Sequence, residues 1–276
     1  MLKTKQQRLE QLLTRLGRPL IAYSGGVDSA YLIHVAHQVC RTGMLAVIAD
    51  SPSLARTQLQ DALAFAQEQG IPVEVIQTTE MESPEYVRND RSRCFHCKDE
   101  LFQVMEKYAG EHGFDAIAYG VNQDDQEDFR PGQAAARQHR VAAPLLDAGL
   151  TKSEIRELAR RAGLRVWDKP ASACLSSRIE YGRPVTAEAL SAIEQGEDAL
   201  RALGFRQFRV RHHGDIVRIE IDRLELPRAL NLEAFAELTR IFKALGFTFV
   251  TLDTEGFRSG SMNSSRPVKS LLKVLP

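Results

Sequence analysis

The strongest constraint on the fold is an alternation of short apolar runs with helix-like segments in the first half of the chain. Residues 18–40 read RPLIAYSGGVDSAYLIHVAHQVC, which is an apolar run, a glycine turn and then apolar residues at helical spacing. Further apolar runs occur at 44–50, 71–79 and 114–120, with helical patterns between them. Such alternation predicts an α/β fold built on a doubly wound parallel sheet.

Ligands of such sheets bind at the carboxyl ends of the strands. Loops 24–29, 50–53 and 120–132 each follow a predicted strand, so we expect them to open on the same edge. A further helix is predicted to begin at the T-x-x-E capping box of Thr151 and Glu154 and to end near Gly163.

The remainder of the chain has a different character. The segment WDKPASACLSSRIEYGRP is rich in Ser, Pro and Gly and predicts a loop that leads out of the first domain. Segments 201–210 and 243–252 each predict a helix that ends at Gly and runs into a strand, and 215–222 predicts another strand. We therefore expect a domain at 1–184 and a smaller α+β domain at 185–276.

Composition limits the class of protein. With 276 residues the chain can bury a core without disulfides. Lys plus Arg equals Asp plus Glu at 36 each, so no global charge favours a nucleic-acid partner, although a local basic patch stays open. The N-terminal 19 residues predict an amphipathic helix, and no run approaches the roughly 20 apolar residues that span a bilayer. We expect a cytoplasmic protein with reduced thiols and no membrane partner.

The loop SGGVDS at 24–29 lies between a predicted strand and a predicted helix, where backbone N–H groups can hold a phosphate. No Lys follows its second glycine and G-x-G-x-x-G is absent, so neither a Walker A loop nor a dinucleotide motif fits. The pattern S-G-G-x-D-S resembles the PP-loop of ATP pyrophosphatases, which split ATP into AMP and pyrophosphate. A helix-capping turn that merely contains Gly-Gly is the alternative. The predicted nucleotide-binding residues are Ser24, Gly25, Gly26, Asp28 and Ser29.

The same resemblance implies roles for two acidic residues. Asp28 would hold Mg²⁺ on the pyrophosphate, since hard cations take carboxylate ligands. Asp50, which precedes Ser51 after the second predicted strand, resembles the place where this superfamily seats the nucleotide, and a helix cap would look the same. ATP would convert an oxygen of the substrate into an adenylate, from which a nucleophile displaces AMP.

Four cysteines are present. Cys40 lies among apolar residues and is interpreted as part of the core. Cys94 and Cys97 form C-x-x-C at the start of a predicted helix, where the helix dipole favours thiolate. This spacing fits a redox disulfide, a zinc site or an iron–sulfur site. Cys174 lies in KPASACLSSR. His96 is not assigned as a ligand, and a structural zinc site that uses it stays open.

Nearly the whole chain resembles the LarE family of PP-loop sulfur-transfer enzymes. The matching stretches are AYSGGVDS, NQDDQEDFRPG, PLLDAGLTKSEIRELARRAGL, WDKPASACLSSR, RVRHHGDIVRIE and the C-terminal LGFTFVTLD with GFRSGSMN. The resemblance implies thiolation of a pyridinium-3,5-biscarboxylic acid mononucleotide, a step toward a nickel-pincer nucleotide cofactor. It also implies adenylylation of a carboxylate by ATP, displacement of AMP by sulfur, and a homo-oligomer.

The family has two variants. In one, a cysteine of the KPAS loop gives up its own sulfur; in the other, three cysteines hold a [4Fe-4S] cluster that carries an exchangeable sulfide. Cys94, Cys97 and Cys174 supply the count that the cluster variant requires, and the sacrificial cysteine aligns with Ala173. The resemblance therefore favours the cluster, with sacrificial use of Cys174 as the alternative.

Several charged residues are further candidates. Asp125, Asp128 and Arg130 follow the fourth predicted strand and would orient substrate or metal, or form a solvated acidic loop. Ser177 and Arg178 lie close to Cys174, where an Arg can hold a carboxylate or phosphate bidentately or form an ordinary ion pair.

Arg209 and Arg211 are two apart on a predicted strand, hence on one face, and would bind the substrate phosphate or form an exposed basic strand. Glu220 lies in a family stretch without an assigned role.

Three other functions compete with this interpretation. A tRNA thiolase also combines a PP-loop with three cysteines and a cluster, and it would bind tRNA. A regulatory protein that only binds zinc or nucleotide would release no pyrophosphate. An amide-forming ligase would need an ammonia source, and no glutaminase domain fits in 276 residues.

Overall fold

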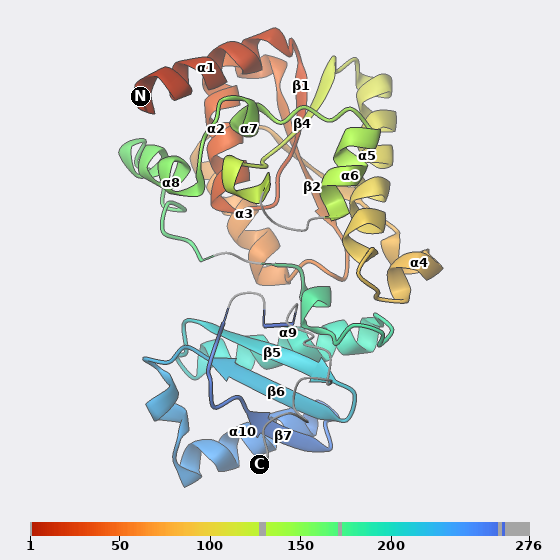
Figure 1. Ribbon diagram of the computed structural model, residues 1–276, viewed down its shortest axis with the longest axis vertical. Helices are drawn as coiled ribbons and strands as arrows, with labels where there is room; N and C mark the ends of the chain where they lie inside the picture. Colours follow the sequence, from red (N-terminus) through yellow and green to blue (C-terminus); the bar gives the residue numbers. More distant parts are fainter. Residues whose placement is uncertain (1, 127–130, 171–172, 259–260, 263–276) are drawn as a thin grey trace, which may run out of the picture. The chain divides into compact units, whose positions relative to one another are not determined.

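The computed structural model describes residues 2–126, 131–170, 173–258 and 261–262 (Figure 1). The chain divides into two compact units, Met1–Ala173 and Cys174–Pro276, and each is described by itself. The boundary lies before the one expected at residue 184, because the segment after Cys174 pairs with the second unit: Ile179 forms a parallel bridge with His212.

The first unit contains a parallel four-stranded sheet. Its strands are β1 (Pro19–Ala22), β2 (Leu45–Asp50), β3 (Val73–Gln77) and β4 (Ala116–Tyr119). Their order in the sheet is β3-β2-β1-β4, and every neighbouring pair is parallel. All four carboxyl ends therefore lie at one edge, so the predicted fold class is confirmed.

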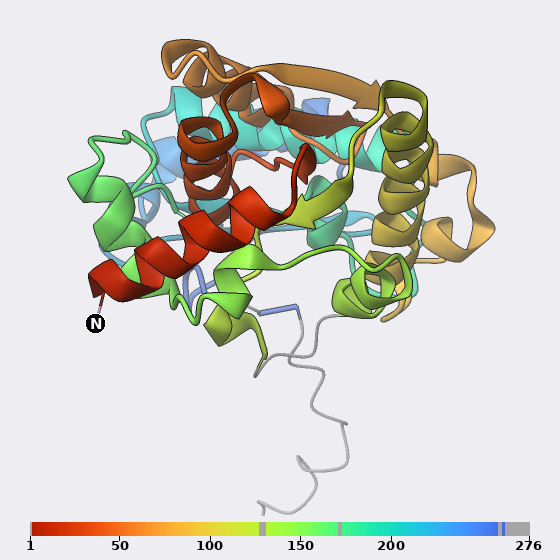
Figure 2. The same cartoon turned by 90° about the horizontal axis from the view of Figure 1, so that it is seen from above.

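Helices cover both faces of this sheet (Figures 1 and 2). The helices of this unit are α1 (Leu2–Arg15), α2 (Val27–Cys40), α3 (Arg56–Glu68), α4 (Pro84–Val87), α5 (Arg93–His112), α6 (Pro131–Gln138), α7 (Pro144–Asp147) and α8 (Lys152–Arg161), with 3-10 turns η1 (Arg41–Gly43), η2 (Glu80–Glu82) and η3 (Gln123–Gln126). Strand residues alternate between the two faces. In β1, Ile21 packs with α1, α2 and α8, whereas Leu20 packs with α5 and α6.

The predicted capping box forms at the start of α8. The Thr151 hydroxyl accepts from the Glu154 backbone N–H, and the Glu154 carboxylate accepts from the Thr151 backbone N–H at 3.0 Å. This satisfies two backbone donors that the first turn would otherwise leave without partners. No helix in the described ranges is both long and apolar enough to cross a membrane.

The second unit is a small α+β arrangement. It contains η4 (Leu175–Arg178), α9 (Ala187–Ala202), β5 (Phe208–His213), β6 (Ile216–Ile221), η5 (Leu226–Ala229), α10 (Leu232–Ala244) and β7 (Phe249–Leu252). β6 pairs antiparallel with β5 and parallel with β7. The two predicted helix–Gly–strand repeats are α9–β5 and α10–β7, and they turn at Gly204 and Gly246, both with positive φ.

Candidate functional site

The loop between β1 and α2 has the geometry of an anion cradle. α2 begins after Gly26 without a side-chain cap, so no capping side chain occupies the N–H groups of its first turn. The Ser29 hydroxyl stabilises the turn from inside: it accepts from the Ser24 N–H at 3.2 Å and donates to the Gly26 carbonyl at 3.1 Å.

The two glycines of this loop have different reasons to be glycine. Gly25 has φ +72°, and a Cβ there would lie 2.8 Å from the Cβ of Ala62 in α3. Gly26 has φ −79°, and a Cβ there would make only an ordinary contact of 3.6 Å with the Ser24 hydroxyl. Gly25 is therefore required by the fold, whereas Gly26 leaves the cradle open.

Asp28, in the first turn of α2, forms an ion pair with Lys152 of α8 through Oδ2. Among the described residues its other oxygen, Oδ1, is buried and has no hydrogen-bond partner. Burial raises the pKa of Asp28 above its usual value, although Lys152 opposes the shift. A buried carboxylate oxygen without a partner fits a ligand of Mg²⁺, which takes oxygen ligands beside phosphates.

Asp50 ends β2 at the same edge of the sheet. Its carboxylate is paired with Arg56 at 2.5 Å, and Arg56 also donates to the Ser51 carbonyl at 2.8 Å. Behind them, the buried hydroxyls of Ser51 and Ser53 lie 2.8 Å apart, and Ser53 donates to the buried carboxylate of Glu80 at 3.1 Å. A role of Asp50 in binding nucleotide stays a prediction.

The loop after β4 returns to the PP-loop. A Cβ on Gly120 would lie 2.8 Å from the Ser29 backbone nitrogen, so only glycine allows this approach. The buried Asp125 accepts from the Asn122 N–H at 3.0 Å, which closes the turn. Asp128 and Arg130 lie outside the described residues and stay predictions.

Cys94 and Cys97 lie at the start of α5, as predicted. Cys94 is exposed, Cys97 is half-buried, and neither forms a disulfide. Two neighbours position this turn. The buried Arg93 contacts Cys94 Sγ at 4.0 Å through Nη2. In α6, a Cβ on Gly132 would approach the Cys94 carbonyl to 3.3 Å, so the two helices are close at this point.

The other two cysteines differ from this pair. Cys40 packs against the core formed by α1 and α2, and burial raises the pKa of its thiol. Cys174 precedes η4 in the second unit and is half-buried. Its carbonyl accepts from the Ser177 hydroxyl at 2.7 Å and from Arg178 Nη1 at 2.9 Å.

Arg178 is itself almost fully buried. Its Nε and Nη2 donate to the Glu197 carboxylate of α9 at 2.9 and 3.2 Å. Glu197 also lies 3.3 Å from the Val210 N–H of β5. The guanidinium therefore supports the Cys174 loop from within the fold, and substrate binding by Arg178 stays a prediction.

The chain is 33% identical over 266 residues to the pyridinium-3,5-bisthiocarboxylic acid mononucleotide synthase of Lactiplantibacillus plantarum, covering 96% of this chain and 95% of that protein. The chain belongs to the LarE family. This confirms the prediction of an enzyme from an ATP-dependent sulfurtransferase family.

The chain is also similar to other proteins. An uncharacterized protein of Synechocystis is 41% identical over 263 residues, covering 95% of this chain and 98% of that protein. A tRNA-5-methyluridine(54) 2-sulfurtransferase of Pyrococcus horikoshii is 30% identical over 129 residues, which cover only 43% of this chain. No family model matches the chain.

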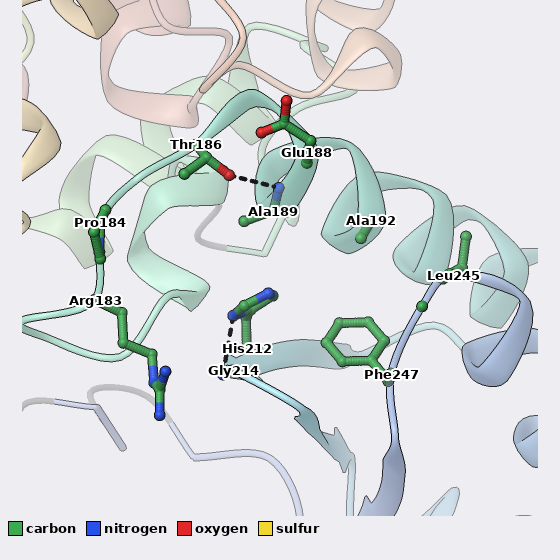
Figure 3. A pocket seen from close by; sticks show the side chains of 11 residues that line it. Arg183, Pro184, Thr186, Glu188, Ala189, Ala192, His212, Gly214, Leu245 and Phe247 are labelled. Atoms are coloured by element: carbon green, nitrogen blue, oxygen red, sulfur yellow. Dashed lines mark hydrogen bonds between the residues drawn. The ribbon is translucent and has the colours of Figure 1, made fainter.

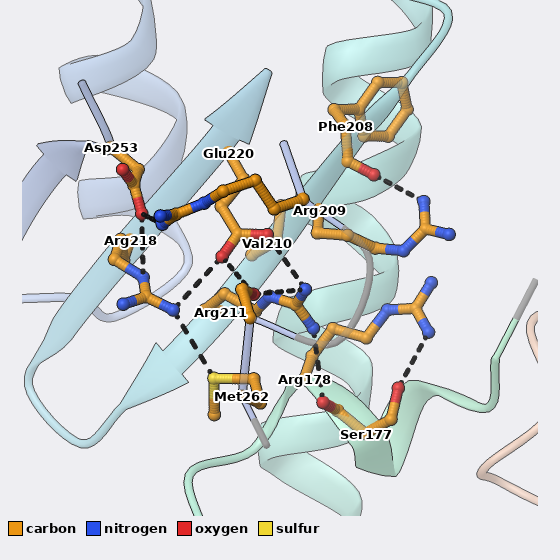
Figure 4. A network of polar contacts seen from close by, with 12 residues as sticks. Ser177, Arg178, Phe208, Arg209, Val210, Arg211, Arg218, Glu220, Asp253 and Met262 are labelled. Atoms are coloured by element: carbon orange, nitrogen blue, oxygen red, sulfur yellow. Dashed lines mark hydrogen bonds and ion pairs between the residues drawn. The ribbon is translucent and has the colours of Figure 1, made fainter. Parts of the chain in front are cut away.

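In this LarE-family chain the predicted basic strand is not a simple exposed surface. We use the term arginine network for Arg178, Arg209, Arg211, Arg218, Glu197, Glu220 and Asp253, all of which except Glu197 are labelled in Figure 4. Arg211 is buried and pairs with the fully buried Glu220 at 2.8 Å, while Arg218 approaches the other oxygen of Glu220 at 3.1 Å. Arg211 also donates to the Ser177 carbonyl at 3.3 Å.

Arg209 lies on the same strand, with its guanidinium over the Phe257 ring at 4.9 Å. Burial, followed by repulsion from Arg178, lowers the pKa of Arg209 to about 10. The side chain therefore remains charged at neutral pH. A contact of Arg209 with a substrate phosphate stays a prediction.

A shallow pocket of about 300 Å³ lies elsewhere in the second unit (Figure 3). Arg183, Thr186, His212 and Phe247 are among its lining residues, which include none of the predicted site residues. Among the described residues, no three His, Cys, Asp or Glu side chains converge as a metal site.

Sequence reasoning missed Lys152, Glu197 and the buried Glu80. Lys152 lies within one of the family stretches, between the two capping-box residues Thr151 and Glu154. The capping box explained this segment as a helix start, so the lysine did not stand out. Glu197 and Glu80 lie in patterns typical of a helix and a loop, and nothing local distinguishes them from solvated acids. Each of these residues meets its partner only through the tertiary fold.

Proposed function

We propose that this LarE-family enzyme uses ATP to transfer sulfur to a pyridinium-3,5-biscarboxylic acid mononucleotide, as a step in making a nickel-pincer nucleotide cofactor. The observation that carries the proposal is the full-length match to the Lactiplantibacillus plantarum synthase. The uncapped start of α2 supports it, because a triphosphate is the kind of ligand that such a cradle holds.

In the first step, a substrate carboxylate oxygen attacks the α-phosphorus of ATP and pyrophosphate leaves. The N–H groups of the loop 24–29 would hold phosphate oxygens and stabilise the charge that develops on them. Asp28 would hold Mg²⁺ through Oδ1, and the metal would neutralise charge on the pyrophosphate.

In the second step, a sulfur nucleophile attacks the carbonyl carbon of the acyl-adenylate, and AMP leaves with the former carboxylate oxygen. We propose that Cys94, Cys97 and Cys174 hold a [4Fe-4S] cluster that carries this sulfur. When bound, such a cluster offers one iron without a cysteine ligand, where an exchangeable sulfide can reside. The two accessible thiols in one helical turn support this donor set.

Residues 177, 178, 209 and 211 are proposed to contribute to the reaction. Ser177 and Arg178 hold the carbonyl of Cys174, and Glu197 fixes Arg178 in turn. Arg209 and Arg211 are proposed to lie near the substrate phosphate, since guanidinium groups bind phosphate bidentately. Asp128 and Arg130 keep their proposed role in orienting substrate or metal.

The decisive experiment is anaerobic purification followed by measurement of iron and sulfide, on the wild type and on Ser variants at each cysteine. We expect about four irons and about four sulfides per chain, or about five sulfides when the exchangeable one is bound. Both counts should fall in the Cys94, Cys97 and Cys174 variants and stay unchanged in the matched Cys40→Ser control. Zinc without iron would contradict the cluster. A loss of one sulfur atom from Cys174 after turnover, found by mass spectrometry, would assign the sacrificial reaction instead.

A tRNA thiolase is the second candidate, supported by the partial match to the Pyrococcus horikoshii tRNA sulfurtransferase. A tRNA-binding measurement at low salt separates the two functions, because phosphate contacts dominate such binding and are strongest there. We expect no binding. The homo-oligomer implied by the family stays a prediction, which sedimentation can test.

A further inference from the structure

Lys152 lies between two acidic groups beside the PP-loop. It is the first residue of α8, and its backbone N–H donates to the Asp124 carboxylate at 2.8 Å. Its ammonium forms an ion pair with Asp28 Oδ2, and the side chain is about one-third exposed. The backbone N–H and the ammonium group of Lys152 are therefore both held by partners beside the PP-loop.

The fold delivers this lysine from a distant part of the chain. Lys152 and Asp28 are 124 positions apart. Gly120 allows the end of β4 to pass against the backbone of Ser29, and the Gln123 N–H donates to the Leu150 carbonyl at 2.9 Å. These contacts fix the start of α8 beside the loop, so the position of the lysine does not depend on its own side-chain contacts.

The charges at this edge are unfavourable for a bare triphosphate. Asp28, Asp124 and Asp125 contribute carboxylates around the loop, and the loop itself carries no cation. A polyphosphate that enters must meet positive charge to offset them. Lys152 is a cation in contact with the loop. In the described structure its charge neutralises that of Asp28.

We propose that Lys152 is an exchangeable partner of Asp28: without nucleotide its ammonium neutralises the carboxylate, and when MgATP binds it moves to a phosphate oxygen and releases Asp28 to the metal. The inference rests on the proposed nucleotide site. It deepens that proposal by supplying, from α8, the phosphate-binding lysine that the loop lacks. It also predicts that a lone divalent cation binds poorly, since the lysine competes for the same carboxylate.

The test is the variant Lys152→Gln in the full chain, with two separate binding measurements. Mn²⁺ alone is titrated into nucleotide-free protein and followed by electron paramagnetic resonance, and MgATP is titrated by calorimetry. We expect Mn²⁺ to bind at least about fivefold more tightly and MgATP about tenfold to a hundredfold more weakly, the range for loss of one hydrogen bond to a charged group. Lys152→Arg retains the charge and should restore most of the MgATP affinity.

The matched control is Lys5→Gln, because Lys5 forms an ion pair with Glu154 in the same first turn of α8 at 2.7 Å. We expect both affinities to stay at wild-type values. A double variant, Lys152→Gln with Asp28→Asn, should lose the gained Mn²⁺ affinity.

Each other outcome overturns the exchange. Weaker MgATP binding with unchanged Mn²⁺ binding would make Lys152 a nucleotide ligand that does not compete for Asp28. Tighter Mn²⁺ binding with unchanged MgATP binding would make it only a counter-ion. If the wild type itself binds no MgATP, the proposed nucleotide site fails; if the wild type binds and Lys152→Gln matches it in both measurements, only the exchange fails.

Discussion

The PP-loop edge of the first unit and the arginine network of the second use similar charged groups in opposite ways. At the loop, backbone N–H groups are uncapped and a carboxylate oxygen of Asp28 has no hydrogen-bond partner in the described structure. In the network, Glu197 and Glu220 are buried and each is paired with arginine. The buried Nε atoms of Arg211 and Arg218 also have no hydrogen-bond partner in the described structure, so the contrast lies in the carboxylates. The Asp28 carboxylate keeps one oxygen for a ligand, whereas those of Glu197 and Glu220 hold arginines in place.

The largest expected effect tests the second half of this comparison. Glu197→Ala leaves Arg178 buried without its bidentate partner, and we expect a loss of about 3–5 kcal/mol in the free energy of unfolding, measured by chemical denaturation. Glu180→Ala is the control, since its pair with Arg183 is about half exposed, and we expect at most about 1 kcal/mol. Equal losses would show that burial of the network contributes nothing.

The next effect separates stability from binding at the loop. Gly25→Ala forces a positive φ and a close contact with Ala62, and we expect it to cost about 2 kcal/mol of folding stability or more. Gly26→Ala should stay within about 1 kcal/mol of the wild type, yet weaken MgATP binding because its methyl group enters the cradle. Calorimetric titration and thermal unfolding of both variants check this, and a Gly26→Ala protein with wild-type affinity would contradict it.

A third prediction compares two helix caps of the same chemistry. Thr151 caps α8 and Thr186 caps α9, each by accepting from a backbone N–H in the first turn. We expect Thr→Ala at either position to cost about 1 kcal/mol. Only Thr151→Ala should also weaken MgATP binding, because α8 carries Lys152. If both variants weakened MgATP binding, or if neither did, the cap of α8 would have no special role in nucleotide binding.

The smallest expected effect is a difference in how two histidines make the free energy of unfolding depend on pH. In the first unit, burial lowers the pKa of His139, but hydrogen bonds to Asp99 and Glu106 outweigh it and the net pKa is raised. In the second unit, burial, followed by Arg183, lowers the pKa of His212. The stabilisation from His139 is complete below the unfolded pKa of about 6.5 and is lost as pH rises through the folded value; that from His212 is complete above about 6.5 and is lost as pH falls.

These two contributions to stability can be measured by chemical denaturation at several pH values. The proteins compared are the wild type, His139→Gln and His212→Gln. Each contribution should be at most about 1 kcal/mol, since solvent screens partly exposed groups. His139→Gln should remove a loss of stability at high pH, and His212→Gln a loss at low pH. The same sign for both variants would contradict the assignment.

Much of the fold could be predicted because its signals are local. Apolar runs of strand length, helical spacing and the capping box at Thr151 are each encoded within a few neighbouring residues. The loop 24–29 was recognisable for the same reason, and the cysteine pair lies at the start of α5 as its spacing indicated. The unit boundary was less predictable, because the bridge between Ile179 and His212 joins segments that carry no shared local pattern.

By itself, the sequence determined the parallel sheet, the phosphate loop and the family, since these depend on periodicity, on glycine and on residues at fixed spacing. The tertiary structure alone decided which charges meet. Lys152 reaches Asp28 across 124 positions, and Arg178 pairs with Glu197 inside the second unit. An ion pair depends on the path of the backbone through space and on its burial, and neither is a property of neighbouring residues.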